Sequence, residues 1–374
     1  MNYRTIAILV FFILASFEQH AADTINVGIS KIKFIDEQRM AWDGKSKRPV
    51  LSHIFYPTLD THVETVLLGK PGEELFRAGS SVWNAKPIEK IKLPLIIMSH
   101  GTGGSALQML WIAENLVQHG YIVVGVNHHG NTAIESKKYA EGYKLWWERS
   151  QDLSVVLDKL SIDDKWSSYI DQNKIGVIGF SLGGYTAISA IGGITDKSLF
   201  VKFCQSSERD FTCDAQVEFS SIDAEFNKVK DTIRVKESML RQHDSYKIDR
   251  IKAAFVLAPA VVQAITKESL QSIIVPVSVV VGSNDRVAPA QSNAQRISSL
   301  INGASYSEID NVGHYTFLSN CTTLGRKYLK DLCSDHESVV RKKVHNTVSN
   351  NAVDFFNSVF SYNNALQPRH EVQH

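Results

Sequence analysis

Short apolar runs alternate with amphipathic segments along most of the chain. Apolar runs of strand length occupy residues 93–98, 121–126, 253–257 and 275–281, and a last strand is expected at 305–309. Residues 107–118 and the segment that ends at Leu160 carry apolar positions at helical spacing instead. This alternation predicts a mostly parallel central sheet with right-handed crossovers and flanking helices, which is the α/β class.

The N-terminal part departs from this alternation. Residues 24–34 and 50–56 predict two strands joined through a polar turn at Asp43-Gly44, and we expect them to form an antiparallel edge of the sheet. Residues 57–92 contain Pro, Gly and mixed charge without a clear period, so they predict a loop with at most one short helix. A C-terminal helix is expected over about 338–360.

One apolar run ends in a sharp serine turn. Residues 174–185 read KIGVIGFSLGGY and continue into a helix of small residues. In a G-x-S-x-G turn the serine hydroxyl projects above the sheet, and the flanking glycines permit close approach of the strand and the helix. Ser181 is therefore the candidate nucleophile, and the N–H of Leu182 is a candidate donor to an oxyanion.

A second loop contributes candidate backbone donors. The strand at 93–98 runs into SHGTGG, residues 99–104, whose glycines expose backbone amides without bulky side chains. In a parallel sheet this loop lies at the same edge as Ser181. The pattern predicts an oxyanion hole built from the N–H groups of Thr102 and Leu182, although such glycines can also serve only to turn the chain.

An acid and a base follow later strands. Asp285 comes directly after the run at 275–281, and His314 lies on the loop after 305–309. A serine hydroxyl needs an imidazole base, which in turn needs a carboxylate to fix its tautomer. Ser181, Asp285 and His314 appear in the chain order serine, acid, histidine, each just past a predicted strand, so they form the predicted catalytic triad.

The adjacent histidines His128 and His129 stand at another strand end. Neighbouring side chains on a strand point apart, and no carboxylate stands at ligand spacing. We therefore expect them to line the substrate pocket and predict no metal site.

Composition limits the partners and the compartment. The 374 residues carry a formal net charge of +1, which gives no reason to expect a nucleic-acid partner. Arg4 precedes an apolar stretch at 6–17, which predicts a signal peptide over residues 1–22 and a secreted or periplasmic protein, with an uncleaved anchor as the alternative. The mature domain is then 23–374.

Four cysteines agree with an oxidising compartment. Of the three connectivities, the two local pairs Cys204–Cys213 and Cys321–Cys333 are favoured. Free thiols are the alternative, and metal binding is weaker still because neither pair has the C-x-x-C spacing. The first pair lies within residues 196–250, a charged and helical stretch that we interpret as a cap-like insertion over the active site, with a solvated elaboration as the alternative.

The motifs together resemble the α/β-hydrolase superfamily, and in particular the dienelactone-hydrolase-like branch that includes the platelet-activating-factor acetylhydrolases. The resemblance covers nearly all of the mature chain, from VGISKIKFIDEQR through SHGTGG, NHHGNT, GFSLGG and VVGSNDRVAP to GHYTFLSNC. It implies hydrolysis of lipid-like or small acyl esters through an acyl-serine, without a cofactor.

Two positions depart from that family pattern. Dienelactone hydrolases use a cysteine nucleophile, whereas residue 181 is serine, so their substrate is not implied. Eukaryotic acetylhydrolases of this type carry the acid after the preceding strand, where this chain has Leu257-Ala258-Pro259 and no carboxylate. Asp285 is therefore expected to serve as the acid.

Three classes of function follow from these motifs. A serine esterase or lipase-like hydrolase is the first expectation, and a serine peptidase or amidase with the same triad is the second. A catalytically silent binding protein is the third. The expected partner is a small-molecule or lipid ester, while contact with a membrane surface, the acyl-chain length and the oligomeric state are left open.

Overall fold

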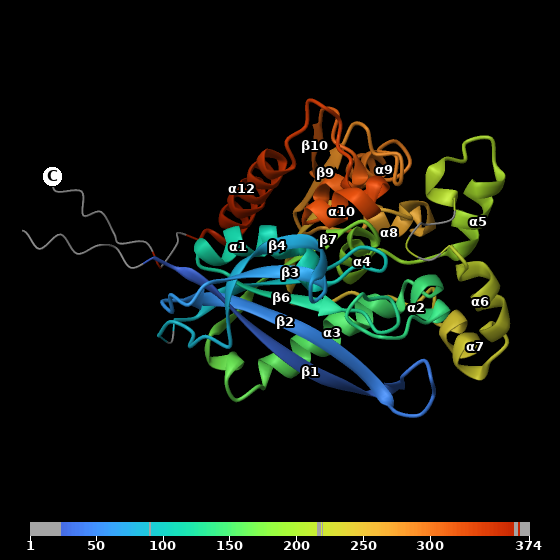
Figure 1. Ribbon diagram of the computed structural model, residues 1–374. Helices are drawn as coiled ribbons and strands as arrows, with labels where there is room; N and C mark the ends of the chain where they lie inside the picture. Colours follow the sequence, from blue (N-terminus) through green and yellow to red (C-terminus); the bar gives the residue numbers. More distant parts are fainter. Residues whose placement is uncertain (1–23, 90, 215–217, 219, 363–365, 367–374) are drawn as a thin grey trace, which may run out of the picture.

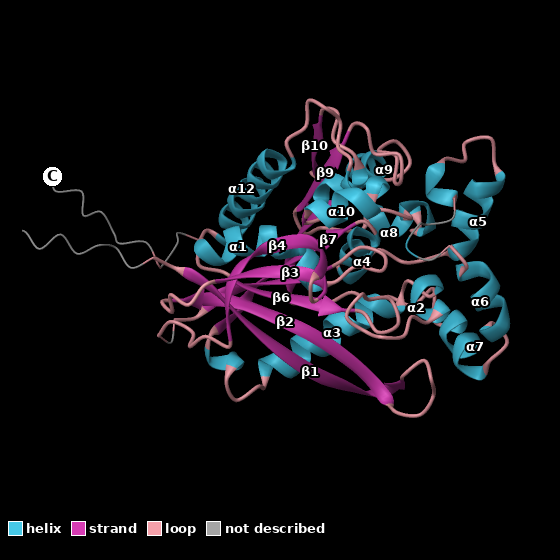
Figure 2. Ribbon diagram, in the orientation of Figure 1, coloured by secondary structure: helices cyan, strands magenta, loops and turns pink. Residues whose placement is uncertain are grey.

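A computed structural model describes residues 24–89, 91–214, 218, 220–362 and 366 of the chain. The predicted signal peptide at 1–22 therefore lies outside the described residues. Within the described part, one sheet runs through the molecule with helices on both of its faces (Figures 1 and 2). No described helix has the length and apolar character needed to cross a membrane.

Six neighbouring strands of the sheet are parallel, in the order β10-β9-β8-β7-β5-β6. The strands are β5 (Leu93–Ser99), β6 (Ile122–Asn127), β7 (Ile170–Phe180), β8 (Ile251–Leu257), β9 (Val277–Gly282) and β10 (Ser305–Ile309). The predicted parallel sheet is confirmed. Strands β5 and β6 are buried at every position because helices cover both faces, which explains their continuous apolar runs.

The N-terminal strands extend the sheet beyond β6. β1 (Asn26–Met40) and β2 (Lys47–Thr58) form a long antiparallel pair, and β2 is also antiparallel to β6. β1 pairs in parallel with β4 (Glu73–Trp83), which in turn is antiparallel to β11 (Asn320–Cys321).

The prediction of a loop over 57–92 was wrong. β3 (Glu64–Lys70) and β4 form an antiparallel hairpin around a turn at Pro71-Gly72. Only one residue of β3 is buried, and its sequence, ETVLLGK, shows no alternation of apolar and polar positions that would reveal a strand. The Pro-Gly turn was the available signal.

Two layers of helices enclose the core. α1 (Leu110–Gln118) packs against α12 (Arg341–Phe360) on one face, and α3 (Glu148–Ser161) packs beside α4 (Leu182–Ala190) on the other (Figure 1). On α12, Phe356 contacts Phe255 of β8, so the C-terminal helix lies over the central strands. Shorter elements complete this part: η1 (Ala106–Met109), α2 (Ala140–Lys144), η2 (Trp166–Ser168), η5 (Val262–Ala264), α8 (Lys267–Gln271), α9 (Ala294–Leu300), η6 (His314–Phe317), α10 (Thr323–Tyr328) and α11 (Lys330–Cys333).

The segment between α4 and β8 is helical, as expected. It contains α5 (Lys197–Gln205), η3 (Phe211–Cys213), α6 (Ile222–Val229) and α7 (Ile233–Leu240), which project to one side of the sheet (Figure 1). A disulfide between Cys204 and Cys213 joins α5 to η3. A second disulfide joins Cys321 and Cys333, so both local pairs favoured by the sequence are present.

Candidate active site

Ser181 stands in a strained turn between β7 and α4. Its backbone has φ 56° and ψ −121°, a conformation that L residues rarely adopt. The Ser181 N–H donates to the carbonyl of Leu257 (2.9 Å), and its carbonyl accepts from Gly184 N–H (2.8 Å). Hydrogen bonds on both sides therefore hold the turn in place.

Two glycines are required by close approach at this turn. A Cβ at Gly179 would lie 1.9 Å from the carbonyl oxygen of Gly183, and a Cβ at Gly183 would lie 2.0 Å from the carbonyl oxygen of Ser99. The G-x-S-x-G pattern thus reflects contact between β7, α4 and the end of β5. Any larger residue at either position would push the serine turn out of place.

The structure brings Ser181, His314 and Asp285 together. Nε2 of His314 lies 2.9 Å from Oγ of Ser181, and Nδ1 lies 2.7 Å from Oδ2 of Asp285. All three side chains are buried. With Asp285 at its Nδ1 position, the imidazole carries the Nδ1 proton and leaves Nε2 free to accept the serine proton.

Asp285 is fixed by its own loop. Its second oxygen, Oδ1, accepts from the N–H groups of Val287 (3.0 Å) and Ala288 (2.8 Å). The carboxylate therefore meets the imidazole in one orientation. These contacts belong to the loop that follows β9, which is where the sequence placed the acid.

Thr102 and Leu182 both lie beside the serine. Leu182 is the first residue of α4, so its N–H has no partner within the helix. Thr102, Ser181 and Leu182 line one cavity together. A Cβ at Gly101 would lie 3.2 Å from the Cβ of Ser181, so the loop before Thr102 passes directly next to the serine.

Two small cavities meet at Ser181. The first, about 120 Å³, lies on the Leu182 side and is bounded by Trp146 and by Phe200 of α5. The second, about 150 Å³, lies on the His314 side. Its walls include Phe180, Leu318 and Glu218, so it combines apolar surface with one carboxylate.

Glu218 was not identified from the sequence. Tyr315 donates to its Oε1 (3.3 Å), whereas its Oε2 is buried and has no hydrogen-bond partner among the described residues. Burial raises the pKa of this carboxyl group above its usual value. No local motif marks Glu218, because it reaches the His314 cavity only through the fold of the insertion.

The expectation that His128 and His129 line the substrate pocket is not met. His128 is buried between Oγ of Ser99 (2.9 Å) and Oδ2 of Asp152 (3.0 Å), and burial lowers its pKa to about 3. His129 contacts Glu135 through Nδ1 (2.9 Å). Neither histidine borders the two cavities at Ser181, because the backbone after β6 directs both rings into the interior.

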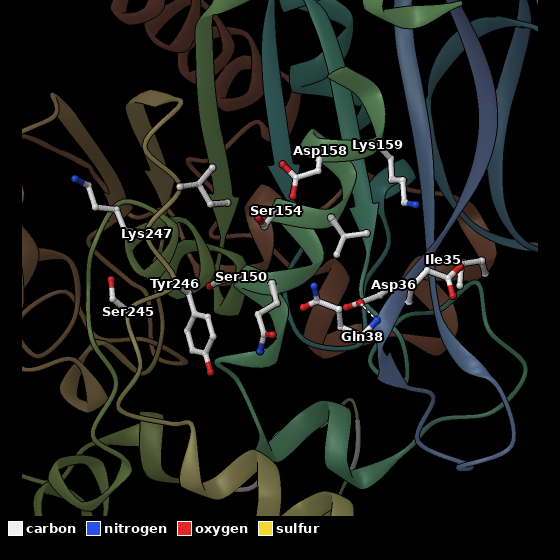
Figure 3. A pocket seen from close by; sticks show the side chains of 14 residues that line it. Ile35, Asp36, Gln38, Ser150, Ser154, Asp158, Lys159, Ser245, Tyr246 and Lys247 are labelled. Carbon is white, nitrogen blue, oxygen red and sulfur yellow. Dashed lines mark hydrogen bonds between the residues drawn. The ribbon is translucent and has the colours of Figure 1, made fainter. Parts of the chain in front are cut away.

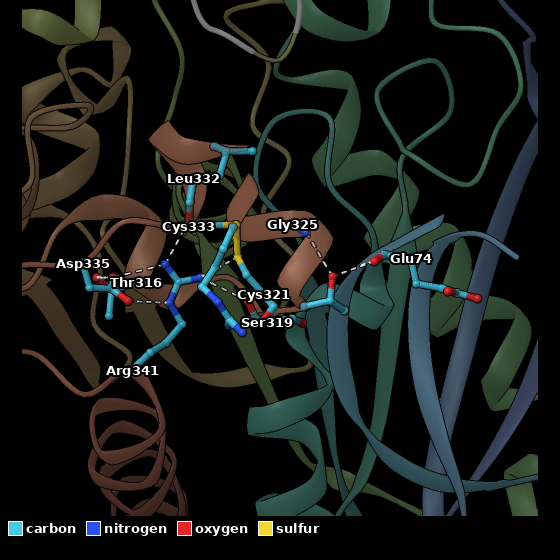
Figure 4. The surroundings of a disulfide bond; sticks show 11 residues. Glu74, Thr316, Ser319, Cys321, Gly325, Leu332, Cys333, Asp335 and Arg341 are labelled. Atoms are coloured by element: carbon cyan, nitrogen blue, oxygen red, sulfur yellow. Dashed lines mark hydrogen bonds and ion pairs between the residues drawn. A yellow bond between two sulfur atoms is a disulfide. The ribbon is translucent and has the colours of Figure 1, made fainter. Parts of the chain in front are cut away.

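The loop that carries His314 is held by a disulfide and a buried arginine (Figure 4). Cys321–Cys333 ties the chain after η6 to α11. Nε of Arg341 forms an ion pair with Asp335 (2.9 Å), and Nη1 donates to the carbonyl of Ser319 (3.1 Å). These contacts surround the segment that begins at His314.

A larger hollow of about 380 Å³ lies elsewhere (Figure 3). It is lined mostly by polar side chains of β1, α3 and residues 245–248, including Asp36, Ser154 and Tyr246. None of the residues predicted to act in catalysis borders it. Although this cavity is larger than those at Ser181, it is therefore not part of the candidate active site.

Comparisons with known proteins agree with this fold. The model of the prolyl oligopeptidase family matches residues 107–201, which include Ser181. The platelet-activating factor acetylhydrolase of Bos taurus is 29% identical over 153 residues, which are 30% of this chain and 34% of that protein. The acetylhydrolase of Canis lupus familiaris is 28% identical over 151 residues, 29% of this chain and 34% of that protein. The matched region thus spans about a third of the length of these curated relatives.

A solved structure matches nearly the whole chain. The ferulic acid esterase from Streptomyces cinnamoneus superposes with a TM-score of 0.60 and 18% sequence identity, covering 92% of this chain and 94% of its own. At this identity the likeness concerns the fold. Together with the strand order and the Ser181 turn, these matches show that the chain has the α/β-hydrolase fold and is similar to proteins of its esterase-like branch.

Proposed function

We propose that the protein is a serine hydrolase that cleaves carboxylic esters, with Ser181 as nucleophile, His314 as general base and acid, and Asp285 as the carboxylate that orients the imidazole. The observation that carries the proposal is the continuous hydrogen-bonded chain from Oγ of Ser181 through His314 to Asp285. The acetylhydrolase relatives support an ester rather than an amide as the substrate.

The reaction follows from this geometry. Nε2 of His314 accepts the hydroxyl proton as Oγ of Ser181 attacks the ester carbonyl carbon. The carbonyl oxygen becomes an oxyanion that the N–H groups of Thr102 and Leu182 stabilise. His314 then returns the proton to the alcohol oxygen as the acyl–oxygen bond breaks. Water repeats the sequence and releases the acid from Ser181.

The two cavities determine which part of the ester lies on which side of Ser181. The alcohol oxygen must lie next to Nε2 of His314 to receive its proton, so the alcohol occupies the cavity on the His314 side. The acyl group then occupies the cavity of about 120 Å³ on the Leu182 side. Pockets for drug-sized ligands measure roughly 300–1,000 Å³, so this one suits a short acyl chain.

The insertion at 196–250 serves as a cap in this proposal. Phe200, Thr212 and Cys213 belong to it and border the acyl cavity together with Trp146 of the core. We also propose that the protein acts outside the cytoplasm, since its two disulfides suit an oxidising compartment.

Hydrolysis of aryl esters with two to sixteen acyl carbons tests the proposal, with Ser181→Ala as the control. We expect turnover of the shortest esters and stoichiometric labelling of Ser181 by a fluorophosphonate. Absence of both turnover and labelling would reject a serine hydrolase. Turnover that rises with chain length would keep the hydrolase but reject the short acyl pocket.

A peptidase or amidase is the second candidate. The match to the prolyl oligopeptidase family model supports it, because that family carries the name of a peptidase. Hydrolysis of peptide anilides faster than that of aryl acetates, abolished in Ser181→Ala, would put this candidate first.

A further inference from the structure

Arg149 lies directly behind the predicted oxyanion hole, and the sequence assigns it no catalytic role: it belongs to WERSQDLSVVLDKL, residues 147–160, one of the stretches that carry the family resemblance. It stands in the first turn of α3 and its side chain is 1% exposed. Its Nη2 donates to the carbonyl of His100 and to Oγ of Ser99 (3.3 Å), and its Nε donates to Oγ1 of Thr186 (3.1 Å). One guanidinium thus contacts both the end of β5 and helix α4.

These contacts fall where the two oxyanion elements cross. His100 precedes Gly101 and Thr102, and its carbonyl oxygen would lie 2.8 Å from a Cβ at Gly183. On the other side, the Thr186 hydroxyl that accepts from Arg149 donates to the carbonyl of Leu182 (2.9 Å). The guanidinium is therefore one hydrogen bond away from each segment that carries a predicted donor.

The charge of Arg149 lacks a direct counterion among the described residues. Within the part of the chain that the structure describes, no carboxylate forms an ion pair with it. Asp152, one turn further along α3, is engaged by Arg39 (2.6 Å), Arg48 (2.8 Å) and His128 (3.0 Å). Burial lowers the pKa of Arg149 to about 9, although the nearby Asp152 opposes this effect.

Burying a cation without a counterion costs desolvation free energy, and neutral side chains could join the two segments by the same hydrogen bonds without that cost. It becomes useful when negative charge develops nearby. The tetrahedral intermediate places that charge at the Thr102 and Leu182 amides, where a preorganised positive charge is worth most in a site without water.

We propose that Arg149 is a positioning residue for the oxyanion hole, which holds the Thr102 loop against the first turn of α4 and favours the oxyanion through its positive charge. This inference rests on the proposed function. It predicts an effect on the transition state that exceeds any effect on substrate binding.

The test compares Arg149→Met, Arg149→Lys and Arg48→Met. Arg48 is equally buried, but it contacts Asp152 and Trp42 rather than either oxyanion segment, so it controls for loss of a buried arginine. The measurements are kcat and KM for an aryl acetate, the inhibition constant of a trifluoromethyl ketone that forms a tetrahedral adduct, and the melting temperature.

We expect Arg149→Met to lower kcat by about 10–100-fold with KM changed less than about threefold, and to weaken the ketone by a similar factor. Arg149→Lys should retain part of kcat and part of the ketone affinity, because lysine keeps the positive charge but lacks the several N–H donors of the guanidinium group. Arg48→Met should lower the melting temperature while kcat stays within about threefold of wild type. If Arg149→Met does not fold, the test uses Arg149→Lys alone, and a loss of kcat that exceeds the change in KM supports the inference.

The inference is overturned if folded Arg149 variants keep wild-type kcat, or if Arg48→Met loses as much kcat and ketone affinity as Arg149→Met. Failure of the proposed function would look different, because wild type itself would then neither hydrolyse the ester nor react with a fluorophosphonate at Ser181.

Discussion

At the scale of single residues, Asp285 has two tasks that can be separated. One oxygen faces Nδ1 of His314, and the other accepts two backbone N–H groups of its own loop. An amide at this position can keep part of the loop contacts, but its NH₂ group facing Nδ1 favours the wrong imidazole tautomer.

We therefore predict that Asp285→Asn lowers kcat by about 10⁴-fold while the protein remains folded. Ester hydrolysis and a melting curve on the same preparation measure this. Activity close to wild type would mean that another carboxylate orients His314, and Glu218, which borders the same cavity, would be the next residue to replace.

His345 supports a second prediction at this scale. Its Nε2 bonds the carbonyl of Thr316 (2.8 Å), its ring stacks on Trp111, and burial lowers its pKa to about 4. In the unfolded chain the imidazole of His345 has a pKa near 6.5, whereas in the folded chain its pKa is about 4. Between these values the unfolded state holds more protons, so stability falls as pH falls.

His345→Gln retains an N–H donor but removes the titration. We predict that its free energy of unfolding depends less steeply on pH between 6.5 and 4 than that of wild type, by up to about 1.4 kcal/mol per pH unit. Denaturant unfolding of both proteins at several pH values measures the slopes. Parallel curves would show that His345 titrates alike in both states.

At the scale of elements, strands buried on both faces were predictable and strands at the sheet margin were not. β5 and β6 are uninterrupted apolar runs because no position of either faces solvent. The β3–β4 hairpin was missed because only one residue of β3 is buried and the buried positions of β4 are irregularly spaced, so neither strand shows a regular two-residue period.

The candidate site shows the same division. Ser181, Asp285 and His314 were found because each follows a recognisable strand, and the carboxyl ends of parallel strands share one edge. The orientation of His128 and the contacts of Arg149 depend on loop backbone and on partners distant in sequence. Local patterns carry no information about either.

The disulfide beside the His314 loop supports a prediction at this scale. Its two cysteines are 12 residues apart, and Arg341 braces the same segment (Figure 4). We predict that replacing Cys321 and Cys333 with serine lowers the free energy of unfolding by about 2–5 kcal/mol and also lowers kcat, because His314 loses part of its support.

Replacing Cys204 and Cys213 with serine is the matched control. That pair lies in the insertion and supports no part of the His314 loop, but Cys213 borders the acyl cavity, so we expect a stability loss with a change in KM that exceeds the change in kcat. Equal losses of kcat per folded molecule in both double variants would contradict a specific effect on the His314 loop.

At the scale of the whole molecule, the acyl cavity is shared between the sheet core and the insertion. Phe200 of α5 meets Trp146 edge to face with ring centroids 5.3 Å apart, and both rings border the cavity. Under the proposed function, the size of the acyl group is therefore set where the two parts of the chain meet.

We predict that Phe200→Ala raises the ratio of kcat/KM for an octanoyl ester over an acetyl ester by about tenfold or more, because the lost ring lengthens the cavity. Val201→Ala changes an exposed neighbour on the same helix and should leave the ratio unchanged. An unchanged ratio in Phe200→Ala would place the acyl group elsewhere.

The backbone of Ser181 has a consequence for the history of the chain. Its positive φ penalises every residue except glycine by roughly 1–3 kcal/mol, so Ser181→Gly should make the protein inactive yet more stable. A lineage released from selection for turnover would gain robustness by losing this one hydroxyl. Serine at this disfavoured backbone position is therefore what selection for the proposed chemistry would leave in a single chain.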